Sequence, residues 1–235
     1  MHCAPPRGYD RGLRVHLLHI SKTGGTALRQ ALEPAAASHG LILHDHFTLL
    51  RDVPSHEHAC FVVRDPVTRF VSGFNSRLRM GRPLIHMPWT DAERWAFDRF
   101  RTPNELAEAL SADQEERRED AVRAMAGIRH VNMHQSEWLH SVEYLVERRD
   151  SIAFVGFQPR LSDDFARLKA RLALPDALTL PRDPVRAHAT PVGFDTSLSP
   201  PARENVARWY ARDAAIVEYL AARSDTESGR EEHPV

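Results

Sequence analysis

The feature that most constrains the fold is a short apolar run that ends in two adjacent glycines and continues directly as a helix-forming segment. Residues 14–20 (RVHLLHI) are the apolar run, SKTGG follows, and residues 26–37 (TALRQALEPAAA) favour a helix that ends near Pro34. The pattern predicts a strand, a tight turn and a helix. Because a helix start carries unpaired N–H groups and a positive dipole end, this turn is a candidate phosphate site.

The residue types of the turn suit an anion. Gly24 and Gly25 let the backbone approach a phosphate closely, and Thr23 and Thr26 offer hydroxyl donors. Lys22 precedes the glycines, where its side chain can reach the atoms that join the phosphate to a transferred group. This order excludes a Walker A loop, in which the lysine follows the glycines. A tight connection that binds nothing is the alternative interpretation.

Three further apolar runs predict strands at residues 41–44, 59–63 and 151–157. Helical patterns fall at residues 66–79, 91–100, 103–111, 113–126, 134–147, 158–174 and 200–223. Strands that alternate with helices indicate an α/β fold with a small parallel sheet flanked by helices. We expect a flexible leader at residues 1–12, one domain at 13–223, and a disordered tail at 224–235.

The composition gives no support for a nucleic-acid-binding, membrane-spanning or disulfide-rich protein. The formal net charge is −1, which gives no argument for nucleic acid or a membrane as partner. No stretch is apolar for long enough to span a bilayer, and the N-terminal residues lack a signal-peptide core. Two cysteines cannot build a disulfide framework, and Cys60 fits a buried apolar position. We therefore expect a cytoplasmic protein.

A second motif, RDPVTRFVSGF, follows the third predicted strand at residues 64–74. Arg64 stands at the strand's carboxyl end, where open α/β sheets bind ligands, and Ser72 lies eight residues later. A guanidinium and a nearby hydroxyl suit a second phosphate. Asp65 fits a helix cap, and Arg69 is four residues from it, which favours a structural ion pair for Arg69.

Together, HISKTGGTAL and RDPVTRFVSGF resemble the sulfotransferases that use 3′-phosphoadenosine 5′-phosphosulfate (PAPS), especially the carbohydrate branch with its 2-O-sulfotransferases. Residues 154–175 and 209–220 add to the likeness, whereas residues 80–130 carry little of it. The resemblance implies a P-loop-NTPase-like three-layer fold. It implies transfer of a sulfuryl group from PAPS to an acceptor hydroxyl, on a carbohydrate or another small hydroxylated molecule, without a metal.

The resemblance also implies a role for individual positions. Lys22 would contact the bridging oxygen of the phosphosulfate, and Arg64 and Ser72 would bind the 3′-phosphate. The residues that would hold the 5′-phosphate are Thr23, Gly24, Gly25, Thr26 and Ala27. Ser21 departs from the family pattern, which usually has proline there.

Removal of the acceptor proton needs a base, and histidine has a suitable pKa. His44 and His46 alternate at the end of the second predicted strand, so both can face one cleft. The resemblance favours His46 as the base with His44 in support. Surface or core packing is the alternative interpretation for this pair. A metal site shared with the HEH at residues 56–58 is disfavoured, because nothing else pairs with these imidazoles.

Two later segments complete the predicted site. His134 and Gln135 resemble residues that line the acceptor side in this branch, and Arg186 and His188 lie in a proline-rich loop that would close over the nucleotide. Two other functions compete with sulfuryl transfer. A small-molecule phosphotransferase would need a Mg-binding acid and a lysine after the glycines. A catalytically inactive relative that binds the nucleotide is the third hypothesis.

Overall fold

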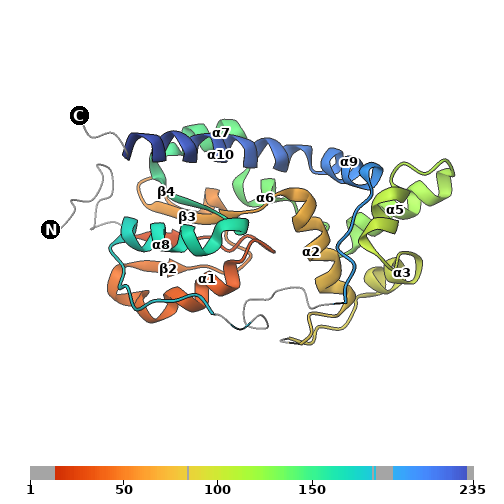
Figure 1. Cartoon of the computed structure of the whole chain (residues 1–235), viewed down its shortest axis with the longest axis horizontal. Coiled ribbons are helices and arrows are strands. Elements are labelled where there is room, and N and C mark those ends of the chain that lie inside the picture. The colour runs from red at the N-terminus through yellow and green to blue at the C-terminus, as the bar shows by residue number, and fades with distance from the viewer. Residues whose placement is uncertain (1–13, 84, 182, 184–192, 232–235) are drawn as a thin grey trace. The chain divides into compact units, whose positions relative to one another are not determined.

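The computed structural model describes residues 14–83, 85–181, 183 and 193–231, and the fold is α/β (Figure 1). Four strands form one all-parallel sheet in the order β2-β1-β3-β4. Their bounds are β1 Val15–Leu17, β2 Leu41–Leu43, β3 His58–Val63 and β4 Ile152–Phe157. All four predicted strands and the parallel sheet are therefore confirmed.

The sheet buries one face against two helices, α1 (Gly25–Leu32) and α8 (Leu161–Leu172). Alternating strand residues turn to this side because successive side chains of a strand point to opposite faces. The cluster combines Val15 and Leu17 of β1 with Cys60 and Val62 of β3. Burial raises the pKa of the Cys60 thiol to about 12, so Cys60 is a packing residue as predicted.

The other helices have the following bounds: α2 Pro66–Leu78, α3 Asp91–Arg99, α4 Pro103–Ala109, α5 Glu115–Gly127, α6 Gln135–Leu139, α7 Val142–Glu147, α9 Pro200–Trp209 and α10 Ala211–Glu231. The Asp65 carboxylate accepts from the Thr68 N–H at 2.8 Å and Pro66 opens α2, as predicted. Thr90 and Thr102 cap α3 and α4 in the same way.

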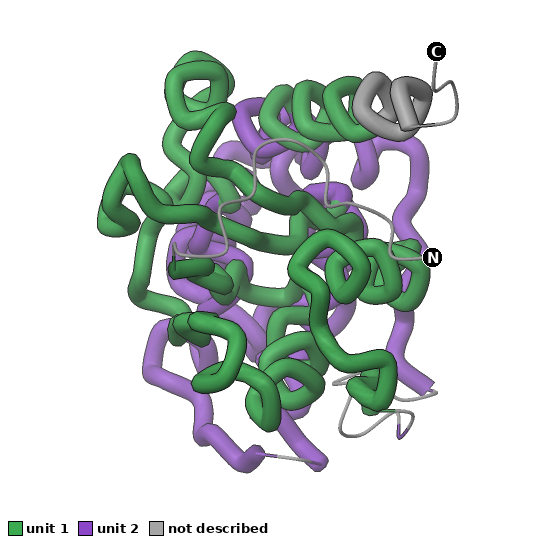
Figure 2. Tube along the Cα trace, turned by 90° about the vertical axis from the view of Figure 1, so that its left-hand side faces the viewer, with its two compact units in different colours: residues 1–64, 135–182, 215–235 green, residues 65–134, 183–214 purple. Residues whose placement is uncertain are grey.

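The chain divides into two compact units (Figure 2). The first contains residues 1–64, 135–182 and 215–235 and includes the sheet, and the second contains residues 65–134 and 183–214. The sequence analysis expected one domain over residues 13–223. Both units draw on separated stretches of sequence, which leaves no single linker to mark a boundary.

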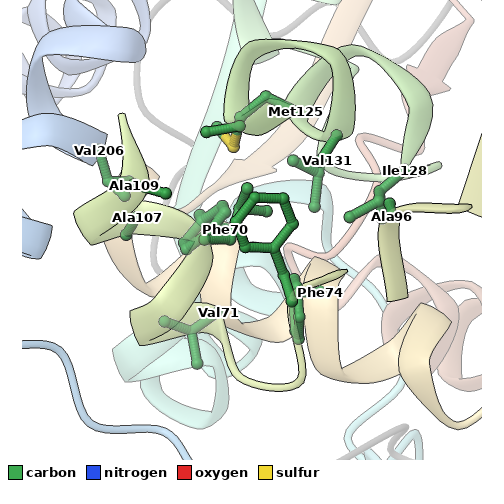
Figure 3. Packing of buried hydrophobic residues seen from close by; sticks show 14 of the residues in the cluster. Phe70, Val71, Phe74, Ala96, Ala107, Ala109, Met125, Ile128, Val131 and Val206 are labelled. Carbon is green, nitrogen blue, oxygen red and sulfur yellow. The ribbon is translucent and has the colours of Figure 1, made fainter. Parts of the chain in front are cut away.

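The second unit has its own apolar core (Figure 3). Phe70 and Phe74 of α2 are fully buried there, and Phe74 meets Phe97 edge-on with ring centroids 5.3 Å apart. Glu93 is also fully buried and pairs with two arginines, Arg77 at 2.6 Å and Arg129 at 3.0 Å. These ion pairs fix α2 and α3 within the unit.

Two predicted helices are interrupted. The helix expected at residues 134–147 stops at His140, whose φ of 71° is left-handed, and Ser141 caps a new helix. The helix expected at residues 200–223 breaks at Tyr210, and its second half runs on to Glu231. The expected tail is thus helical over residues 224–231, while the expected leader lies outside the described residues. No helix in the described part of the chain is long and apolar enough to cross a membrane.

Candidate functional site

The turn after β1 is built on two left-handed residues. Lys22 has φ 67° and Gly24, the cap of α1, has φ 94°, so the chain reverses sharply before the helix begins. The buried Thr23 hydroxyl donates to the Ile20 carbonyl at 2.9 Å and closes the turn. Thr23 therefore has only its main chain to offer to an anion, whereas the sequence analysis assigned a role to its hydroxyl.

The two glycines of the turn are favoured for different reasons. A Cβ atom on Gly25 would overlap the His19 ring, whereas Gly24 has a positive φ of 94° and its Cβ would lie 2.8 Å from Cδ2 of Leu161. Contacts this short are repulsive, so neither position accepts a side chain without rearrangement. The helix start at Gly25 consequently has a bare main chain, with Thr26 next along it and Ala27 buried.

The turn after β1 and the end of β3 meet at one edge of the sheet. The strands β1 and β3 are parallel neighbours, paired from Val15 and His58 to Leu17 and Cys60. Beyond this pairing, the Arg64 Nη1 atom donates to the Lys22 carbonyl at 3.3 Å. Parallel strands place their carboxyl ends together, which is where ligands bind in open α/β sheets.

A buried glutamine holds Arg64 in place. The Gln135 side chain accepts from the Arg64 N–H at 3.0 Å and donates to the Arg64 carbonyl at 2.8 Å. Gln135 is fully buried at the start of α6. The predicted role of Gln135 on the acceptor side is therefore replaced by a positioning role, since both ends of its amide are bonded to main chain.

His46 is fixed by its own ring and by its main chain. Its Nδ1 lies 3.0 Å from the His19 carbonyl, and its ring contacts the His19 ring at a tilt of 37° with centroids 3.8 Å apart. The Trp138 indole N–H donates to the His46 carbonyl at 2.9 Å. Because a carbonyl only accepts, Nδ1 carries the hydrogen and Nε2 keeps its lone pair in the neutral ring. Trp138 was not among the predicted site residues.

The environment of His46 favours the neutral, basic form. Burial lowers the pKa of His46, the hydrogen bond to the His19 carbonyl and the nearby Asp45 oppose this, and the charges of Lys22 and Arg29 add to the lowering. A histidine whose pKa is lowered keeps its lone pair to a more acidic pH.

His44 has different partners from His46, so the two histidines do not act as one pair. The His44 Nε2 atom lies 2.8 Å from Nδ1 of His16, and His16 Nε2 lies 2.6 Å from a Glu57 oxygen. Arg29 donates to the His44 carbonyl at 3.1 Å. Each ring is thus held by a different histidine of β1 or its turn, and the shared cleft stays a prediction.

Three residues singled out by sequence lie in the second unit. Ser72 is buried in α2, and His134 packs its ring against Tyr210 with centroids 4.8 Å apart. The Arg69 side chain donates to the Met133 carbonyl at 2.7 Å, a structural contact with the main chain. Arg186 and His188 lie outside the described residues.

In comparisons with known proteins, no family model, curated protein or solved structure matches the chain. Within the described ranges, no group of three or more His, Cys, Asp or Glu side chains is arranged to hold a metal ion. Inferences about function therefore depend on the geometry of the site and the resemblance of its two motifs.

Proposed function

We propose that this protein is a PAPS-dependent O-sulfotransferase that acts on a carbohydrate or another small hydroxylated acceptor. The observation that carries the proposal is the hydrogen bond from Arg64 to the Lys22 carbonyl. One nucleotide can be held by two sites only if they lie within its length. The bond brings Arg64, which follows β3, within hydrogen-bonding reach of the turn that precedes α1, and this supports a single nucleotide as the proposed ligand of both.

The roles that we propose for the individual residues follow from their charge and their position. The bare main chain at Gly24 and Gly25 suits the 5′-phosphate, since free N–H groups at a helix start favour an anion. The Arg64 guanidinium suits the 3′-phosphate. Lys22 belongs to the turn that accepts from Arg64, and its ammonium group would stabilise the charge that develops on the leaving phosphate oxygen.

The proposed base is His46, and Nε2 is the atom that accepts. In the transfer, the bond between sulfur and the bridging phosphate oxygen breaks and a bond between sulfur and the acceptor oxygen forms. The acceptor's proton goes to Nε2 of His46, and adenosine 3′,5′-bisphosphate leaves. The hydrogen bond from Nδ1 to the His19 carbonyl holds the ring in the tautomer that this step needs.

The strand order and the helix that starts at the glycine turn also support a P-loop-NTPase-like three-layer arrangement for the first unit. The sequence position of the lysine still separates this chain from the phosphotransferases with Walker A loops. The inactive, nucleotide-binding alternative is disfavoured by the presence of Lys22 and by the basic tautomer of His46.

The test is transfer of radiolabelled sulfate from PAPS to a panel of mono- and disaccharides, phenols and alcohols, in the presence of EDTA. A sulfated product that forms at the same rate with and without magnesium supports the proposal. Transfer of phosphate from ATP instead supports the phosphotransferase. Binding of adenosine 3′,5′-bisphosphate with no product from any acceptor supports the inactive relative.

A further inference from the structure

A chain of hydrogen bonds in the first unit joins three ionisable side chains outside the proposed transfer step. Glu57 precedes β3, His16 lies on β1, and His44 follows β2. The Glu57 carboxylate is 2.6 Å from His16 Nε2, and His16 Nδ1 is 2.8 Å from His44 Nε2. His16, the central member of this hydrogen-bonded series, is only 7% exposed and is therefore shielded from water.

The donor and acceptor of each hydrogen bond can be assigned by starting from the Glu57 carboxylate. An ionised carboxylate only accepts, so the hydrogen lies on His16 Nε2, and His16 Nδ1 keeps a lone pair while the ring is neutral. His44 Nε2 must then donate to His16 Nδ1, which leaves the lone pair of His44 on its Nδ1 atom. The hydrogen bond from His16 lowers the pKa of Glu57, which keeps the carboxylate ionised.

We propose that Glu57, His16 and His44 form a proton relay, which takes up a proton at His44 and stores it on His16. A new N–H bond forms at His44 Nδ1, the N–H bond at His44 Nε2 breaks, and its proton binds His16 Nδ1. The result is a neutral His44 and an imidazolium on His16 that faces the unchanged carboxylate of Glu57. No electron is transferred and no other reactant is needed.

The surrounding charges favour storage on His16 over storage on His44. Burial and the neighbouring His16 lower the pKa of His44, Arg29 acts in the same direction, and Asp45 and Asp52 oppose them. Around Glu57, the charges of Arg14 and His56 reinforce the effect of His16. An imidazolium on His16 has a carboxylate in contact, whereas one on His44 has only more distant acids.

The relay runs from His44, which follows β2, to Glu57, which precedes β3. Its proposed purpose is to take up the one proton that each sulfuryl transfer releases and to hold it away from the reacting groups. This purpose rests on the proposed function. The relay itself is a property of three side chains and can be measured without PAPS or an acceptor.

The experiment is nitrogen-15 imidazole NMR of the full chain as a function of pH, for the wild type and Glu57→Gln. The amide oxygen of Gln can still accept from His16 but carries no charge. Glu33→Gln is the matched control, because it removes an exposed carboxylate of the same unit. We expect both rings of the wild type to have hydrogen on Nε2 at high pH and to titrate in one coupled step.

In Glu57→Gln we expect the midpoint of that step to fall by about 1 pH unit, a tenfold loss of proton affinity. The control should keep the wild-type midpoint. The relay is overturned if His16 carries its hydrogen on Nδ1, or if both rings keep their midpoints in Glu57→Gln. His44→Gln is a second probe, since it removes the group that takes up the proton, and the coupled step should then be lost. If the NMR results agree with the relay but the protein transfers no sulfate, the proposed function is rejected and the relay is retained.

Discussion

The guanidinium of Arg64 donates to the main-chain oxygen of Lys22 over 3.3 Å, although 42 positions separate the two residues in the sequence. The bond joins the end of β3 to the turn after β1. The segments that follow two neighbouring strands thus meet at one edge of the sheet, and Gln135 fixes the main chain of Arg64. That arrangement gives specific expectations for binding, pH dependence and stability.

Replacement of Lys22 by methionine should lower turnover far more than nucleotide affinity. The ammonium group would act where charge develops in the transition state, so we expect a loss of about 10²–10³-fold in kcat. The Kd for adenosine 3′,5′-bisphosphate should change less than tenfold. Lys169→Met is the matched control, because Lys169 bonds to carbonyls of Asp176 and Leu178. Equal losses of kcat in both variants would remove Lys22 from the mechanism.

The acid limb of kcat/KM should lie below pH 6.5, the ordinary pKa of histidine. Burial is the main reason why the pKa of His46 is lowered, and a base works only in its neutral form. The rate is therefore full above the lowered pKa and falls as the pH drops through it. Because the charge of Lys22 contributes to the lowering, Lys22→Met should move the limb toward higher pH. A limb that is unchanged in His46→Gln would assign the titration to another group.

Gly25→Ala should damage both the fold and the anion site. The added methyl would overlap the His19 ring, which in turn contacts the His46 ring with centroids 3.8 Å apart. We expect a loss of roughly 1–3 kcal/mol in the free energy of unfolding. Gly40→Ala is the comparison, because no atom lies within 4 Å of its added carbon and its cost comes only from the positive φ of Gly40, a conformation that Gly25 does not have. Urea unfolding and bisphosphate binding should separate them, with binding weakened only in Gly25→Ala.

Glu93→Gln should destabilise the second unit in a pH-dependent way. Burial acts to raise the pKa of Glu93, but the hydrogen bonds from Arg77 and Arg129 prevail and hold it at about 2. The ionised form therefore stabilises the fold above the ordinary pKa of 4.5, and this contribution is lost as the pH falls toward about 2. We expect a loss of about 3–5 kcal/mol at pH 7.

The contrast for this prediction is Glu204→Gln, which removes an exposed partner of Arg208. Its effect should be about 0–1 kcal/mol. Urea unfolding of both variants at pH 7 and pH 3 provides the comparison. A Glu93→Gln deficit of the same size at both pH values would mean that the carboxylate charge is not the source of stability.

The main elements of the fold could be predicted from the sequence because they depend on local patterns. Apolar runs bounded by Gly, Pro and charge placed all four strands, and Asp65 with Pro66 placed the start of α2. The interruptions at His140 and Tyr210 could not be predicted in the same way. A left-handed histidine has no strong sequence signal, and the Tyr210 hydroxyl is bonded to Val131, which is distant in the sequence.

The candidate site likewise has a part that the sequence predicts and a part that it does not. The turn residues Lys22, Gly24 and Gly25 could be predicted because they are close together in the sequence. The anchoring bonds of Gln135 and Trp138 span 71 and 92 positions and connect side chains to main chain. Such contacts depend on how α6 packs and not on residue spacing. The orientation of His44 likewise depends on His16 of a neighbouring strand.

The most direct test of the account is calorimetric binding of adenosine 3′,5′-bisphosphate and adenosine 5′-phosphate to the wild type, Arg64→Ala and Arg51→Ala. Arg51 is an exposed arginine of the same unit and serves as the control. If one nucleotide is held at both turns, Arg64→Ala should weaken bisphosphate binding about 10–100-fold and barely affect the monophosphate. Equal losses for both ligands, or no preference of the wild type for the bisphosphate, would contradict the account.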